Sequence, residues 1–126
     1  MMRLLTVPDI ILLHKKLIEQ TGGSHGIRDA GLIESAVNRA LATFDGQDLY
    51  STVESKIAAV TYSLVSNHGF IDGNKRVGVT AMLLLLKING YHLSYTQQEL
   101  ITLGLSLADA SATENNIQGW IEDHKK

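Results

Sequence analysis

The sequence predicts an all-α protein, a compact bundle of six helices with a small flap or hairpin between the second and third helices. Apolar residues recur at three- and four-residue spacing in several stretches, which is typical of helices that bury one face. Serine or threonine precedes glutamate by three residues at three places, the spacing of a capping box at a helix start. The single proline, Pro8, opens the first stretch, where its fixed φ suits the first turn of a helix.

The first two helices are predicted from their apolar spacing and their boundaries. The first contains Ile10, Leu13 and Leu17 on one face and should end at Gly22-Gly23. Asp29 is expected to cap the second helix. One stripe of that helix is apolar: Leu32, Ile33, Ala36, Val37 and Ala40. Residues 43–51 break the pattern and are predicted to form a loop or a small hairpin.

The remaining four helices follow from capping boxes and from one strongly apolar run. The box Ser51-Thr-Val-Glu54 predicts a third helix that reaches about Asn67. Residues 77–88 are apolar nearly all round and are followed by Asn89-Gly90, so we expect this fourth helix to be the buried central one. Two further boxes open a fifth and a sixth helix: Thr96-Gln-Gln-Glu99 and Ser111-Ala-Thr-Glu114.

Composition limits the class of protein. The 126 residues are expected to form one domain, because no linker or repeat interrupts residues 1–126. The formal net charge of -2 argues against direct binding to nucleic acid, and the absence of cysteine excludes disulfides and thiolate metal sites. The longest apolar run, residues 81–86, is too short to span a membrane, and the first residues do not resemble a signal peptide. We therefore expect a cytoplasmic protein without a membrane partner.

A polar loop between the third and fourth helices gathers the side chains that can perform chemistry. It reads His68-Gly-Phe-Ile-Asp-Gly-Asn-Lys-Arg76 and leads into the start of a helix, where free N–H groups and the helix dipole favour an anion such as phosphate. Gly73 allows the backbone to approach that anion closely, and the Asn74 side chain can donate to a phosphate oxygen. Lys75 and Arg76 add charge-assisted bonds.

Two further residues of the loop suggest group transfer. Asp72 would repel a phosphate unless a cation lay between them, so its presence predicts Mg²⁺. His68 is the loop residue whose ordinary pKa suits accepting a proton near neutral pH. A lone histidine or an Asp-Gly pair is more often a helix cap or a turn, and it is the joint order of these residues that favours a catalytic site. His14, His25, His92 and His124 have no mutual metal-ligand spacing and are assigned no role.

The loop resembles the signature of the Fic family, His-x-Phe-x-Asp/Glu-Gly-Asn-Gly/Lys-Arg, in the variant with lysine after asparagine that marks Doc (death-on-curing) toxins. Similar residues extend the resemblance over about residues 6–95: Gly26-Ile-Arg-Asp-Ala-Gly-Leu-Ile-Glu-Ser-Ala36, Ala42-Thr-Phe-Asp-Gly46 and Asn89-Gly90-Tyr91. The resemblance implies a Fic-like helical fold and ATP with Mg²⁺ as cosubstrate. It also implies that His68 is the general base, Asp72 the metal ligand, and residues 73–76 the phosphate cradle.

The same resemblance implies that Phe70 anchors the loop in the core and that residues 43–51 form a flap that aligns the target peptide. The sequence departs from the family at two positions. Gly69 replaces a frequent proline, which makes the loop less stiff. Val79 stands where adenylyltransferases of the family carry a second arginine, so ATP is not expected to lie as it does in those enzymes.

These features favour an ATP-dependent protein kinase that phosphorylates a Ser or Thr hydroxyl. Lys75 adds a cation where adenylyltransferases have glycine, and both Lys75 and Val79 disfavour the nucleotide pose that presents the α-phosphate. For Doc-like toxins the resemblance implies elongation factor Tu as the target, so that translation stops. Transfer of AMP by the same site is the first alternative. A non-catalytic module that binds a partner or an anion is the second.

The sequence also predicts how such an enzyme is controlled. Some Fic proteins block their own ATP site with the motif Ser/Thr-x-x-x-Glu-Gly/Asn, and the only glutamate here that is followed by Gly or Asn is Glu114, four residues after Ala110. Because alanine replaces the Ser or Thr, self-inhibition is not expected. We therefore expect a separate, Phd-like antitoxin with a disordered segment that folds against this protein.

Overall fold

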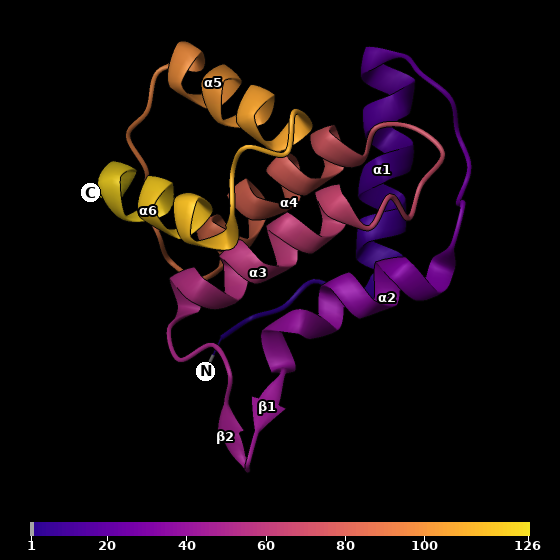
Figure 1. Ribbon diagram of the computed structural model, residues 1–126. Coiled ribbons are helices and arrows are strands. Elements are labelled where there is room, and N and C mark those ends of the chain that lie inside the picture. The colour runs from indigo at the N-terminus through magenta and orange to yellow at the C-terminus, as the bar shows by residue number, and fades with distance from the viewer. Residues whose placement is uncertain (1) are drawn as a thin grey trace.

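The computed structural model describes residues 2–126 and confirms the all-α class, with six α-helices, one 3₁₀-helix and one two-stranded hairpin (Figure 1). The elements are α1 (Val7–Thr21), α2 (Ala30–Asn38), η1 (Arg39–Leu41), β1 (Thr43–Phe44), β2 (Gln47–Asp48), α3 (Val53–Ser66), α4 (Asn74–Ile88), α5 (Gln97–Ala108) and α6 (Glu114–His124). Within residues 2–126, no helix is both long and apolar enough to cross a membrane.

Three of the predicted helix starts are confirmed and two are displaced. Pro8 lies in the first turn of α1, Asp29 caps α2 and the Thr96–Glu99 box opens α5, as predicted. The α3 box instead pairs Thr52 with Ser55, one residue after the predicted one, because the Glu54 carboxylate accepts a hydrogen bond from the Tyr91 hydroxyl.

The start of α6 is displaced for a similar reason. Its capping box pairs Thr113 with Asn116, two residues after the predicted Ser111 and Glu114. The Glu114 carboxylate is bound instead by Arg39, at 2.5 Å. In both helices the glutamate predicted to complete the capping box is bound instead by a side chain distant in the sequence: Glu54 by Tyr91 and Glu114 by Arg39.

The segment between α2 and α3 forms the small hairpin that was predicted. Thr43 pairs with Asp48 and Phe44 with Gln47 in antiparallel register. The turn residues Asp45 and Gly46 both have positive φ, 54° and 79°, the combination that a two-residue type I′ hairpin turn requires. In Figure 1 the hairpin projects from the bundle beyond the start of α3, away from the loop that joins α3 to α4.

The central helix is α3, and the prediction that the fourth helix is the central one was wrong. α3 packs against α2, α4, α5 and α6. α4 packs against α1, α3 and α5, and about half of its residues are buried. Gly78 of α4 allows α3 and α4 to approach closely, because a Cβ there would lie 2.6 Å from Cγ2 of Val65 in α3. The largest fully buried side chains include Phe70, Ile57, Met82, Leu85, Ile117 and Ile121.

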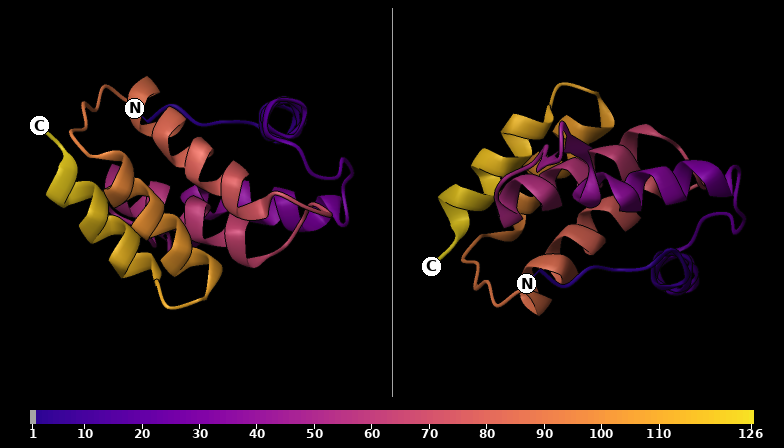
Figure 2. Two further views of the ribbon diagram at one scale, coloured as in Figure 1. Left: turned by 90° about the horizontal axis from the view of Figure 1, so that it is seen from above. Right: turned by 90° about the horizontal axis from the view of Figure 1, so that it is seen from below.

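Helix α1 crosses the ends of the bundle and is seen end-on when the other helices lie lengthwise (Figure 2). Its fully buried face consists of Ile10, His14 and Ile18, whereas the predicted Leu13 and Leu17 are only partly buried. A histidine therefore occupies the centre of the buried face. α1 packs against α4 and lies beside the α3–α4 loop.

Candidate active site

The α3–α4 loop is held by main-chain hydrogen bonds from the segment before α2. The N–H groups of Arg28 and Asp29 donate to Gly69 O at 2.8 and 3.0 Å, and Ile71 N–H donates to Gly26 O at 3.1 Å. Gly69 is buried here, and a Cβ at this position would lie 2.5 Å from Ile33 Cγ1. Tight packing thus replaces the stiffness that a proline would have given this loop.

His68 projects from this loop in a left-handed backbone conformation, with φ of 51°. This conformation costs a non-glycine residue roughly 1–2 kcal/mol, so contacts must maintain it. Arg28 supplies them, since its Nε donates to His68 O at 2.6 Å and its Nη2 donates to Asn67 O at 2.9 Å. The imidazole itself is exposed and lines a cleft.

Phe70 and Asn74 fix the other end of the loop. Phe70 is 2% exposed, and its ring stacks on His14. The buried Asn74 amide donates to Phe70 O and accepts from Phe70 N–H, both at 3.0 Å. Asn74, which the sequence analysis assigned to phosphate, therefore uses its carbonyl and one N–H to hold the loop; the second N–H remains for another acceptor.

Asp72 lies at the edge of the cleft with its side chain 46% exposed. Its two carboxylate oxygens accept hydrogen bonds from Ser24 N–H at 3.0 Å and Gly73 N–H at 2.8 Å. These bonds, with a smaller contribution from the charge of Arg76, hold the pKa of the Asp72 carboxyl below its ordinary value. Asp72 is accordingly an anion at neutral pH.

The helix that follows begins without a side-chain cap. Gly73, the N-cap residue, is left-handed with φ of 78°, and the first N–H that bonds back is that of Val77, to Gly73 O. The N–H groups of residues 74–76 therefore have no partner within the helix. Each of the other five α-helices in residues 2–126 is capped by a Ser/Thr/Asp-type side chain. Among the α-helices of residues 2–126, α4 is thus the one whose first N–H groups have no side-chain cap and are free to meet an anion.

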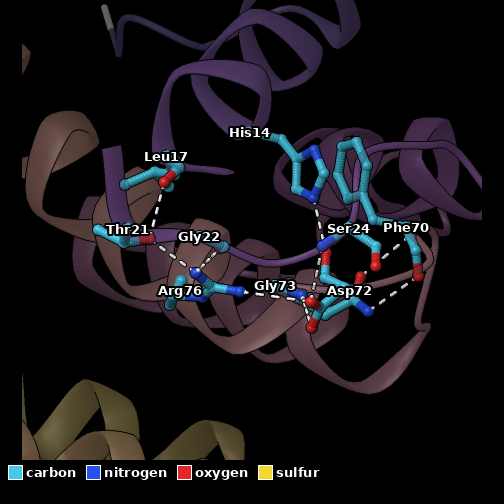
Figure 3. A network of polar contacts seen from close by, with 10 residues as sticks. His14, Leu17, Thr21, Gly22, Ser24, Phe70, Asp72, Gly73 and Arg76 are labelled. Atoms are coloured by element: carbon cyan, nitrogen blue, oxygen red, sulfur yellow. Dashed lines mark hydrogen bonds and ion pairs between the residues drawn. The ribbon is translucent and has the colours of Figure 1, made fainter. Parts of the chain in front are cut away.

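The two cations at this helix end have different surroundings. Arg76 donates to Thr21 Oγ1 at 2.6 Å and to Gly22 O at 2.7 Å, so its guanidinium bridges α4 to the end of α1 (Figure 3). Lys75 is exposed, and no carboxylate of residues 2–126 pairs with it. Its ammonium group is free to meet an anion in the cleft.

These residues open onto one cleft of about 630 Å³. His68, Asp72 and residues 73–76 form one wall, and α3 and the end of α5 form the other through Tyr62, Val65 and Leu107. Residues 43–51 do not line the cleft, since the hairpin precedes the start of α3 whereas the loop follows its end. The hairpin is therefore present as predicted but does not line the cleft, and its role in aligning a target peptide stays a prediction. Residues 2–126 contain no cluster of three metal-ligating side chains.

Sequence reasoning missed three residues that hold the loop: His14, Ser24 and Arg28. Arg28 and Ser24 lie on exposed segments where the sequence gives no signal for such contacts. His14 had one available signal, since it lies four residues after Ile10 and four before Ile18 on the same helix face. A polar side chain at the centre of an apolar stripe indicates a buried hydrogen-bonding partner.

Comparison with known proteins shows the family of this chain. Residues 4–86 match the profile of the Fic/DOC family. Because this match covers more than half of the chain, the protein belongs to the Fic/DOC family.

Two proteins similar to this chain have Doc in their names. Toxin Doc of Mycolicibacterium smegmatis is 44% identical over 73 residues, which are 58% of this chain and 56% of that protein. The chain thus aligns with little more than half of that relative's length. Protein kinase doc of Escherichia phage P1 is 28% identical over 116 residues, 89% of each chain.

Proposed function

We propose that this protein is the toxin of a toxin–antitoxin pair and transfers the γ-phosphate of ATP to a Ser or Thr hydroxyl of a protein, with elongation factor Tu as target. The observation that carries the proposal is the uncapped start of α4, which shares one cleft with an exposed histidine and an ionised aspartate. The names of the two Doc relatives, a toxin and a protein kinase, support the same reading.

The residues present fit ATP with Mg²⁺. The free N–H groups of residues 74–76 and the ammonium of Lys75 provide donors and positive charge for a polyphosphate. Each oxygen of Asp72 accepts one hydrogen bond and has a lone pair left for a metal ion. A single protein carboxylate with phosphate oxygens is a usual way for proteins to bind Mg²⁺. When bound, Mg²⁺ neutralises the charge that develops on the phosphates.

The chain's own residues account for the proton and for orientation. His68 accepts the proton of the target hydroxyl as the hydroxyl oxygen bonds to the γ-phosphorus. The bond from that phosphorus to the β–γ bridging oxygen breaks, and ADP leaves with the electron pair. The N–H groups at the start of α4 and Lys75 stabilise the negative charge on the transferred phosphoryl group.

The test separates the three functions that the site could have. The protein is incubated with elongation factor Tu and with ATP labelled at either the α or the γ position. Label from γ on the target supports the kinase, label from α supports AMP transfer instead, and label from neither leaves a binding module or another target. His68→Ala should lower transfer about 100- to 10,000-fold. His25→Ala is the matched control, because His25 is exposed but does not line the cleft.

We further propose that a Phd-like antitoxin inhibits this protein. The Glu114 carboxylate, the one candidate for self-inhibition in the sequence, binds Arg39 at 2.5 Å, so it is engaged away from Lys75 and Arg76. Expression of the chain alone should arrest growth, and co-expression of an antitoxin encoded beside it should restore growth. Normal growth on strong expression of the intact chain alone would contradict this proposal.

A further inference from the structure

His14 is a buried polar residue that the proposed chemistry does not use. It lies in α1 and is 3% exposed, between Ile10 and Ile18 on the same face. Its ring stacks on Phe70 with centroids 3.8 Å apart and planes 9° apart. The two rings thus form one flat contact between α1 and the loop.

The polar edge of the His14 ring is directed at the residue proposed to hold Mg²⁺. Its Nε2 lies 2.6 Å from the main-chain oxygen of Asp72 (Figure 3). Because a carbonyl oxygen can only accept, the proton of this bond lies on His14 Nε2. The bond connects residues 58 positions apart in the sequence.

The carbonyl that His14 holds belongs to the peptide unit between Asp72 and Gly73. Gly73 packs against the same ring, since a Cβ there would lie 3.4 Å from His14 Nε2 and 3.2 Å from Ile18 Cδ1. A rotation of this peptide would move the Gly73 N–H away from the Asp72 carboxylate, to which it donates at 2.8 Å. It would also turn the first free N–H groups of α4.

We propose that His14 is a positioning residue that fixes the orientation of the Asp72–Gly73 peptide. It thereby keeps the Asp72 carboxylate and the first N–H groups of α4 oriented toward a metal-bound polyphosphate. This inference rests on the proposed function for its consequence in catalysis. Its structural part, that the His14 bond orders the loop, stands on the contacts alone.

Three variants separate the hydrogen bond from general packing. His14→Phe keeps a stacked ring but has no donor, whereas His14→Gln keeps an N–H donor at a similar distance from the backbone. Ile10→Val is the matched control, because Ile10 is fully buried one turn earlier on the same face of α1, and the substitution removes one methylene but no hydrogen bond to the loop. If His14→Phe does not fold, His14→Met replaces it as the variant without a donor.

The first measurement is the Mg²⁺ concentration that gives half-maximal phosphate transfer. Loss of a group that orients a metal ligand typically weakens metal affinity 10- to 100-fold, so His14→Phe should raise this concentration roughly tenfold. His14→Gln should recover most of the shift, and Ile10→Val should leave it unchanged. A merely structural defect lowers the folded fraction and kcat without changing this half-saturation point. An unchanged point in His14→Phe would overturn the inference.

The second measurement does not depend on catalysis. Amide hydrogen exchange of Phe70, Ile71 and Gly73 should be faster in His14→Phe than in the parent and in Ile10→Val. If the parent transfers no phosphate but exchange follows this order, the proposed function fails while the positioning role of His14 stands. Equal exchange in all variants would show that His14 does not order the loop.

Discussion

Replacement of Asn74 by alanine should destabilise the protein far more than a surface substitution, because its amide makes both hydrogen bonds of a buried pair. Asn74 is 9% exposed and satisfies the N–H and the C=O of Phe70, which is itself 2% exposed. A buried polar group left without a partner costs about 1–3 kcal/mol. Two such groups give an expected loss of about 2–6 kcal/mol, against about 5–15 kcal/mol for a whole domain.

The chain contains a matched control in Asn89. Its side chain makes the same two-bond pair with the backbone of Arg3, accepting at 2.7 Å and donating at 2.9 Å, but both bonds are exposed to water. Water can replace them in Asn89→Ala, so that variant should lose about 1 kcal/mol. The residue type and the two-bond pair are the same, so the comparison tests the burial of that pair; Asn89 also donates to Leu85 O at 2.7 Å, a bond without a counterpart at Asn74.

The assay is urea unfolding of the parent and both variants. With an m value of about 2 kcal/mol/M, Asn74→Ala should lower the unfolding midpoint by about 1–3 M, and Asn89→Ala by about 0.5 M. If Asn74→Ala unfolds at the same midpoint as Asn89→Ala, the bonds to Phe70 do not hold the loop. A loss of transfer in that variant would then be a direct effect on phosphate.

Two further predictions concern a loop contact and a pair at the end of the chain. Arg28→Ala should lower phosphate transfer about tenfold with little change in stability, because the guanidinium that holds the His68 backbone is exposed; full transfer would contradict this role. The bond to the Trp120 carbonyl, with Glu99 beside it, raises the pKa of His124, so its contribution to stability is complete below pH 6.5 and is lost as pH rises through the folded-state pKa. The pKa of Glu99 is lowered, first by the Thr96 backbone and then by His124, so its contribution is complete above pH 4.5 and is lost as pH falls through the folded-state pKa. The melting temperatures of the parent and of His124→Gln should differ most between pH 4.5 and pH 6.5 and converge as pH rises through the folded-state pKa of His124, whereas a constant difference would refute the pairing.

The helices could be predicted from the sequence because their signals are local. The Thr96–Glu99 box and the Asp29 cap each lie within one turn of the helix that they start. The starts of α3 and α6 were predicted one or two residues early, since each has two overlapping Ser or Thr candidates. Distant partners decided between them: the hydroxyl of Tyr91 binds Glu54, and Arg39 binds Glu114.

In the candidate site, too, the sequence predicts the residues that are close together in the chain but not their distant partners. The residues that line the cleft are contiguous in the sequence, so a motif could find His68, Asp72 and Lys75 together. The groups that hold them come from α1 and the segment after it, such as Arg28, which is 40 positions before His68. No local pattern encodes such pairs, because they form only when the helices pack. The sequence likewise predicts the hairpin but not its place in the fold, which is before the start of α3, whereas the loop follows the end of that helix.

The contacts of the loop explain why it can keep one shape before any ligand arrives. Its inward side chains, Phe70 and Asn74, are buried and make all of their contacts within the protein. Its outward ones, His68 and Lys75, are exposed and contribute little to the core. Buried contacts thus fix the loop backbone from which His68 and the first residues of α4 extend, and this arrangement is established during folding. Stabilisation of transition-state charge is largest when donors need no reorganisation during the reaction. A capping side chain at the start of α4 would satisfy the same N–H groups and remove that advantage, so the glycine at this N-cap is the feature on which the site depends.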